Sequence, residues 1–147
     1  MPSQDAESAS LLSLEALRGT WRVEANVSSD CPIEWQRTIP TGMTQWEQVD
    51  DHLVITDTTG QVPPAELWPA DDRRLTRTIE VSFFGCSAIE SLSLVIEEYE
   101  EGFIAGSYSA LLTHEGSEAC VAMSEEAGLP ERCETTMQWQ ALRMGGP

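Results

Sequence analysis

Two histidines are the candidate acid–base groups of this chain, and one of them stands beside a carboxylate. His114 precedes Glu115 in a polar stretch, and a histidine–carboxylate pair can transfer protons in catalysis. His52 lies in a short polar turn with Asp50 and Asp51. No Gly-x-Ser-x-Gly elbow, His-Glu-x-x-His helix or phosphate loop accompanies either residue. We therefore interpret both histidines as surface residues and expect the protein not to be an enzyme.

Four cysteines carry the second kind of chemistry. Cys31, Cys86, Cys120 and Cys133 fit two disulfide bonds formed in an oxidising compartment. Zinc is a competing use of cysteine, but no Cys-x-x-Cys pair occurs and neither histidine has ligand spacing from a cysteine. Free buried thiols are the remaining alternative. Of the three possible disulfide pairings we favour Cys31–Cys86 with Cys120–Cys133, because the second bond closes a short loop. We expect no metal and no other cofactor.

The charge balance limits the possible partners. The 147 residues include 25 acids and 8 bases, which gives a net charge of -17, and every base is an arginine. Nucleic acids and anionic membranes bind basic surfaces, so neither is an expected partner. No stretch approaches the roughly 20 apolar residues that span a bilayer. An acidic protein with disulfides is typical of a secreted, periplasmic or outer-surface location.

The polar first residues, 1–9, are expected to form a flexible tail. Such a tail would remain if an export signal had been replaced by a start methionine. Residues 10–147 are expected to form a single β-barrel domain. Whether a lipidated cysteine once lay upstream stays open. We expect a monomer.

Period-two alternation dominates the rest of the chain. In the stretch 21–27, Trp21, Val23, Ala25 and Val27 share one face. Strands are predicted at 21–27, 43–49, 53–57, 65–68, 74–83, 90–98, 103–111 and 133–143. A short helix is predicted from Ser10 to Arg18, and another between the capping Ser117 and Gly128. The fold class is therefore all-β, an eight-stranded antiparallel up-and-down barrel, because eight strands can close without exposed edges.

Simple up-and-down order makes the two ends of this barrel unequal. Connections at 50–52, 69–73 and 99–102 are short and fall at one end. Longer connections, 28–42 and 112–133 among them, fall at the other end. All four cysteines lie at that second end, where cross-links remove the most chain entropy. The strand assignment did not use the cysteines, so their grouping supports it.

The sequence Gly19-Thr20-Trp21 after a short helix, followed by a barrel pattern, resembles the first signature of the lipocalins and the wider calycin group. The resemblance implies that Trp21 plugs the closed end. It also implies that an arginine of the last element packs across this tryptophan, and Arg143 is the candidate. Trp139, on the last strand, is assigned to the same structural cluster by its position. The long 28–42 connection corresponds to the long first loop at the family's open end.

This barrel reading predicts a binding site at the looped end. The expected ligand-contacting residues are Val27, Trp35, Arg77, Phe83, Leu111 and Met137. Trp35 would fold over the opening. Arg77 either enters the barrel, beside a ligand carboxylate or a core acid, or lies on an outward face. Whether the barrel is hollow or filled stays open.

Two functions follow from this reading. The first is binding of a small apolar ligand at the looped end. The alternative is a protein-interaction module, such as a hydrolase inhibitor or surface accessory protein, that acts through the loops at the mouth.

Overall fold

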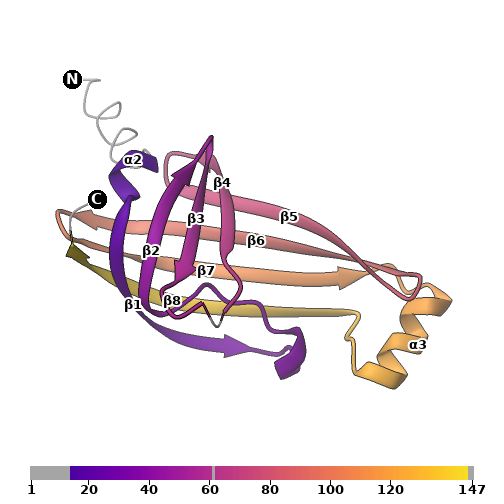
Figure 1. The fold of residues 1–147 in the computed structure, drawn as a ribbon. Coiled ribbons are helices and arrows are strands. Elements are labelled where there is room, and N and C mark those ends of the chain that lie inside the picture. The colour runs from indigo at the N-terminus through magenta and orange to yellow at the C-terminus, as the bar shows by residue number, and fades with distance from the viewer. Residues whose placement is uncertain (1–13, 61, 146–147) are drawn as a thin grey trace.

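The computed structural model describes residues 14–60 and 62–145, which form a closed eight-stranded antiparallel barrel (Figure 1). The strands are β1 (Gly19–Ser29), β2 (Gly42–Val49), β3 (His52–Asp57), β4 (Ala65–Asp71), β5 (Arg74–Phe83), β6 (Cys86–Glu100), β7 (Phe103–His114) and β8 (Arg132–Gly145). Each pairs with its neighbours in the chain, and β1 pairs with β8. The predicted fold class is confirmed. The tail expected at 1–9 and the helix start expected at Ser10 lie outside the described residues.

Three helical segments join the strands: α2 (Leu14–Leu17), the 3-10 turn η1 (Ile33–Trp35) and α3 (Glu118–Ala127). The caps of α3 are those expected from the sequence. The Cys120 amide donates to Ser117 Oγ at 3.3 Å, and Gly128 ends the helix at φ 72°. These caps fix where α3 begins and ends above the sheet.

The inner faces of the strands follow the alternation of apolar residues. In β7, buried positions alternate without interruption from Ile104 through Leu112. Gly106 lies opposite a bulge in β6, between Ile96 and Glu98, where a Cβ atom would come within 1.9 Å of the Val95 carbonyl oxygen. Only glycine permits this close approach of the two strands.

One end of the barrel, which we call the tight end, has two-residue turns at 50–51, 72–73 and 101–102. Trp46 stands at the centre of its core, with ring centroids 5.8 Å from Trp21 and 6.0 Å from Trp139. Trp21 donates its indole N–H to the Leu17 carbonyl of α2 at 2.9 Å. The guanidinium of Arg143 lies 4.4 Å from the Trp21 ring, as expected. The role of Trp46 was missed by the sequence reading.

The other end, which we call the loop end, carries the connections 30–41, 58–64, 84–85 and 115–131. The barrel wall is lower here on one side, because β1–β2 pairing stops at Val23 and Gly42, and β4–β5 pairing stops at Trp68 and Thr76. Strands β5, β6, β7, β8 and β1 continue as an extended sheet, and α3 lies at its far end (Figure 1).

All four cysteines lie at the loop end, as predicted, but the favoured pairing was wrong. The bonds are Cys31–Cys133 and Cys86–Cys120. The β1–β8 register ends with Ser29 opposite Thr135, and two further residues along each chain bring Cys31 opposite Cys133. α3 starts above the beginning of β6 and places Cys120 over Cys86. Strand register therefore decides the pairing, and loop length does not.

Candidate functional site

The loop end has a small hydrophobic core separate from the barrel core. It consists of both disulfides together with Ala88, Leu112, Met123 and Leu129, and Trp35, Val81, Ala119 and Ala127 pack against it. This core lies between the inner face of the extended sheet and α3. The connections 30–41 and 115–131 therefore have a fixed position, through η1 and α3 and the side chains that pack on this core.

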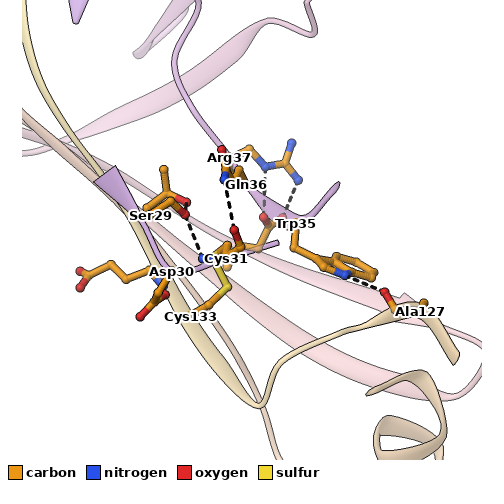
Figure 2. Close-up of a disulfide and its surroundings, with 11 residues drawn as sticks. Ser29, Asp30, Cys31, Trp35, Gln36, Arg37, Ala127 and Cys133 are labelled. Atoms are coloured by element: carbon orange, nitrogen blue, oxygen red, sulfur yellow. Dashed lines mark hydrogen bonds and ion pairs between the residues drawn. A yellow bond between two sulfur atoms is a disulfide. The ribbon is translucent and has the colours of Figure 1, made fainter. Parts of the chain in front are cut away.

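Trp35 holds the first of these connections against α3. Its indole N–H donates to the Ala127 carbonyl at 3.1 Å, as Figure 2 shows. Gln36 Nε2 donates to the Cys31 carbonyl at 3.1 Å, and the Cys31 amide donates to Ser29 Oγ at 3.0 Å. Trp35 thus packs on the helix and the small core. It was expected to fold over the barrel opening.

An ion pair closes the same connection over the sheet. Arg37 donates from Nε to Glu90 Oε2 at 3.1 Å and from Nη2 to Oε1 at 2.6 Å. The Glu90 side chain is only 8% exposed, whereas that of Arg37 is 43% exposed. The hydrogen bond with Glu90 raises the pKa of Arg37 above its ordinary value. A carboxylate on the inner face needs such a partner, because an unpaired buried charge is costly.

Beside this ion pair lies a cavity of about 190 Å³. It opens beyond the last β4–β5 pair, Trp68 with Thr76. Residues of β4, and residues of β5 that no longer pair with β4, form its sides. Its lining comprises Gln36, Arg37, Thr38, Val62, Pro63, Pro64, Ala65, Glu66, Arg77, Ile79, Leu92 and Tyr108. The walls are mainly apolar, with charged and hydroxyl groups gathered among them.

Tyr108 supplies a hydrogen-bond donor to this cavity. The residue as a whole is 3% exposed, but its hydroxyl is not one of the enclosed polar atoms that lack a partner, which in the described part of the chain are His114 Nε2 and Trp139 Nε1. Burial raises the pKa of Tyr108 well above its ordinary value, and the nearby Glu90 adds to that effect while Arg37 opposes it. The hydroxyl therefore stays protonated at neutral pH and can donate a hydrogen bond to a bound acceptor.

Arg77 also borders the cavity. It pairs with Leu92, a buried residue, and directly paired residues of antiparallel strands point to the same face, so Arg77 belongs to the inner face. Its guanidinium lies 4.0 Å from Glu66 and 5.7 Å from the Trp68 ring. The His52 ring stacks on Trp68 at 4.2 Å, and its Nε2 lies 3.0 Å from Glu66. This histidine was expected to be a solvated surface residue, but it is largely covered.

Arg77 is one of six residues predicted from the sequence to contact a ligand, and it lines the cavity. Met137 is buried in the barrel core, and Val27 is half-exposed beyond the point where β2 leaves β1. Leu111 was expected on the inner face, but Leu112 lies there and Leu111 lies outside, because burial in β7 falls on the even-numbered residues. The side chain of Phe83 lies outside the described part of the structure.

Sequence reasoning missed Arg37, Glu90 and Tyr108. A signal for the last two was present, because Glu90 is in phase with Leu92 and Leu94, and Tyr108 is in phase with the buried residues of β7. A polar residue in phase with an apolar stripe is a candidate for a buried site. Arg37 has no such signal, since it belongs to no strand.

Two other groupings were considered as sites. Asp30, Cys31 and Cys133 lie close enough to share a metal ion, but both cysteines are in a disulfide and offer no thiolate. His114 accepts a hydrogen bond from the Gly116 amide at Nδ1, at 3.0 Å, and Glu115 beside it is exposed. The first grouping therefore offers no metal ligand set, whereas His114 and Glu115 border a separate cavity of about 290 Å³ with Glu80, Ser87, Ile89 and Thr113.

No family model, no curated protein and no solved structure matches this chain. No helix within residues 14–60 and 62–145 is long and apolar enough to cross a membrane.

Proposed function

We propose that this barrel is an exported binding protein that takes a small organic acid with a short apolar part into the cavity at its loop end. The observation that carries the proposal is that Tyr108, whose ring is buried, lines the same cavity as Arg37 and Arg77. The three side chains together offer a hydroxyl and two guanidinium groups, which are donors to a ligand oxygen.

The two arginines select an anionic group on the ligand. Arg37 uses Nε and Nη2 for Glu90, which leaves Nη1 for another acceptor. Within the described residues, Arg77 is held by a long ion pair with Glu66 and by its position over Trp68. Charge-assisted hydrogen bonds from guanidinium groups to carboxylates are among the stronger polar contacts in proteins. These donors narrow the expected apolar ligand to a carboxylic acid.

The size and walls of the cavity limit the rest of the ligand. Its 190 Å³ is below the roughly 300–1,000 Å³ of pockets that hold drug-sized ligands. The rest of the barrel interior is filled, since residues such as Trp46, Leu94 and Ile96 are completely buried. Ile79 and Leu92 offer an apolar surface to a short hydrocarbon group. The ligand is therefore an acid of a few carbon atoms.

The proposal is for binding and not for catalysis. The cationic groups beside the cavity are arginines, which do not give up a proton, and the Tyr108 hydroxyl holds its own. Two disulfides fit an oxidising compartment, which supports export.

Isothermal titration calorimetry tests the proposal with a matched pair of compounds, sodium pentanoate and the neutral pentanamide. Wild type should bind the acid and not the amide. Arg77→Met and Tyr108→Phe should each weaken binding of the acid about tenfold or more, because each removes a hydrogen bond to a charged group. Arg74→Met is the control, since Arg74 is exposed and does not line the cavity.

Equal binding of the acid to wild type, Arg77→Met and Tyr108→Phe would show that the acid binds elsewhere. Absence of binding across a series of acids from propanoate to hexanoate would refute the proposal.

A further inference from the structure

The turn between β5 and β6 has an unusual residue in an unusual conformation. Phe83 and Cys86 are paired, so the turn consists of Phe84 and Gly85 alone, and their φ angles are 50° and 90°. Two positive φ angles are typical of the type I′ hairpin turn, whose first position favours asparagine, aspartate or glycine. A bulky side chain in this region is strained against its own backbone.

Nothing in the fold compensates this strain through burial of the ring. Phe84 is 94% exposed. Single exposed apolar residues are common and carry little information by themselves. An exposed aromatic residue that also destabilises its turn is different, because glycine, asparagine or aspartate in its place would make the free protein more stable.

The turn holds Phe84 in a fixed position. Cys86, two residues later, is completely buried and bonded to Cys120 of α3. A Cβ atom on Gly85 would lie 3.5 Å from the Cβ of Ala119, so the turn also packs on the helix. Val121 is a second exposed apolar residue, adjacent to the same disulfide in the chain. An aromatic residue on such a fixed support loses little entropy on binding.

The surroundings of the turn are acidic. The segment from Thr113 to Arg132 contains five glutamates and one arginine, and all six are exposed; the glutamates are Glu115, Glu118, Glu125, Glu126 and Glu131. A partner with a basic surface would be attracted to this region, whereas a second copy of the chain, with its own charge of -17, would be repelled.

We propose that the Phe84–Gly85 turn is a docking site for a protein whose basic surface surrounds an apolar pocket that receives the phenyl ring. Phe84 is the anchor, and the glutamates of 113–132 steer the partner. This site is independent of the cavity, since Phe84 does not line it. Each of the two proposals can therefore fail without the other.

Thermal unfolding gives the first test and needs no partner. Phe84→Asn should raise Tm by about 2–4 °C, because asparagine tolerates the left-handed region. Phe84→Trp should leave Tm close to that of wild type. A lower Tm for Phe84→Asn would mean that the ring stabilises the fold, and this would overturn the inference.

Binding gives the second test. Immobilised wild type, Phe84→Trp, Phe84→Asn and the control Val49→Asn are exposed to an envelope and culture-fluid extract of the source organism at 50 and 300 mM NaCl. Val49 is a matched control because it is exposed beside a two-residue turn at the tight end. Bound proteins are quantified by mass spectrometry.

The proposal requires a basic protein that is retained by wild type, Phe84→Trp and Val49→Asn, is reduced about tenfold or more with Phe84→Asn, and weakens at high salt. Three outcomes overturn it: retention that ignores Phe84, a captured partner that is acidic or is the chain itself, and no Phe84-dependent capture at all.

Discussion

The tight end and the loop end of this barrel are held by different interactions. At the tight end, three indole rings fill the interior. Arg143 packs across Trp21 and donates hydrogen bonds to the carbonyl oxygens of Ala16 and Arg18. At the loop end, two disulfides and the Arg37–Glu90 ion pair hold the chain over a much smaller core. The tight end is therefore stabilised by apolar packing, and the loop end is fixed by specific cross-links between connections.

The turns at the two ends make the same contrast at single residues. Asp50 and Phe84 each begin a two-residue turn, and their φ angles are 54° and 50°. Aspartate tolerates this conformation because its short side chain can bond locally to the backbone, whereas phenylalanine does not. The tight end has a turn residue suited to its backbone, and the loop end has an exposed aromatic residue that is strained in its turn. The following predictions test this division.

The largest effect is expected at the tight end. Trp46→Ala should lower the free energy of unfolding by about 3–5 kcal/mol, because it removes the central ring of a closely packed group. Phe84→Ala is the comparison at the loop end and should change it by less than about 0.5 kcal/mol. Urea unfolding followed by tryptophan fluorescence measures both. Equal losses would contradict the division.

The two disulfides should differ in their contribution. Cys31–Cys133 spans 102 residues and Cys86–Cys120 spans 34. On chain entropy, each contributes about 2–4 kcal/mol, and the longer loop gains about 1 kcal/mol more than the shorter. Two double Cys→Ser variants, one for each disulfide, are compared by thermal unfolding. Removal of Cys31–Cys133 should lower stability more than removal of Cys86–Cys120. The reverse order would mean that local packing outweighs loop length.

Loss of the ion pair comes next. Arg37→Met should cost about 2 kcal/mol, less than the roughly 3–5 kcal/mol of a fully buried pair, because the Arg37 side chain is partly exposed. Arg22→Met, on the exposed face of β1, is the control and should cost under about 0.5 kcal/mol. Chemical denaturation of the two variants makes the comparison. If Arg37→Met behaves like Arg22→Met, Glu90 has another partner or is hydrated.

The smallest effect concerns alkaline pH. Burial raises the pKa of Tyr108, so the unfolded chain releases this proton near pH 10 while the folded chain keeps it. Stability is unaffected below about pH 10 and decreases above it, because the unfolded state binds fewer protons there. Between pH 9 and 11, the free energy of unfolding of Tyr108→Phe should therefore fall by about 1 kcal/mol less than that of wild type. Identical pH profiles would show that the hydroxyl is hydrated in the folded state.

Much of the barrel could be predicted from the sequence because alternation is a local property. The eight strands and the caps of α3 at Ser117 and Gly128 follow from patterns within one element, whereas the contact of Arg143 with Trp21 was expected only from the family resemblance. Up-and-down order is enough to gather the cysteines at one end. The disulfide pairing depends on register across β1 and β8, which local patterns do not specify.

The candidate site was harder to predict because it depends on contacts between distant segments. Arg37 meets Glu90 across 53 residues of sequence, and Arg77 meets Glu66 where two strands separate. The strain at Phe84 depends on a turn of two residues, whereas the sequence suggested a longer connection, 84–89. The Arg77–Glu66 contact depends on the register of β4 with β5, the turn at Phe84 depends on that of β5 with β6, and the Arg37–Glu90 pair depends on the path of a connection outside any strand.

The most direct test of the central claim, that the loop end is the binding end, is a titration of ¹⁵N-labelled protein with sodium pentanoate, followed by amide chemical shifts. We predict saturable shifts at residues 36–38, 65–66, 77–79 and 108, and none at the turns 50–51, 72–73 and 101–102. Pentanamide should produce no saturable shift at the same concentrations. Absence of saturable shifts around Arg77 and Tyr108, or equal shifts with the amide, would contradict the account.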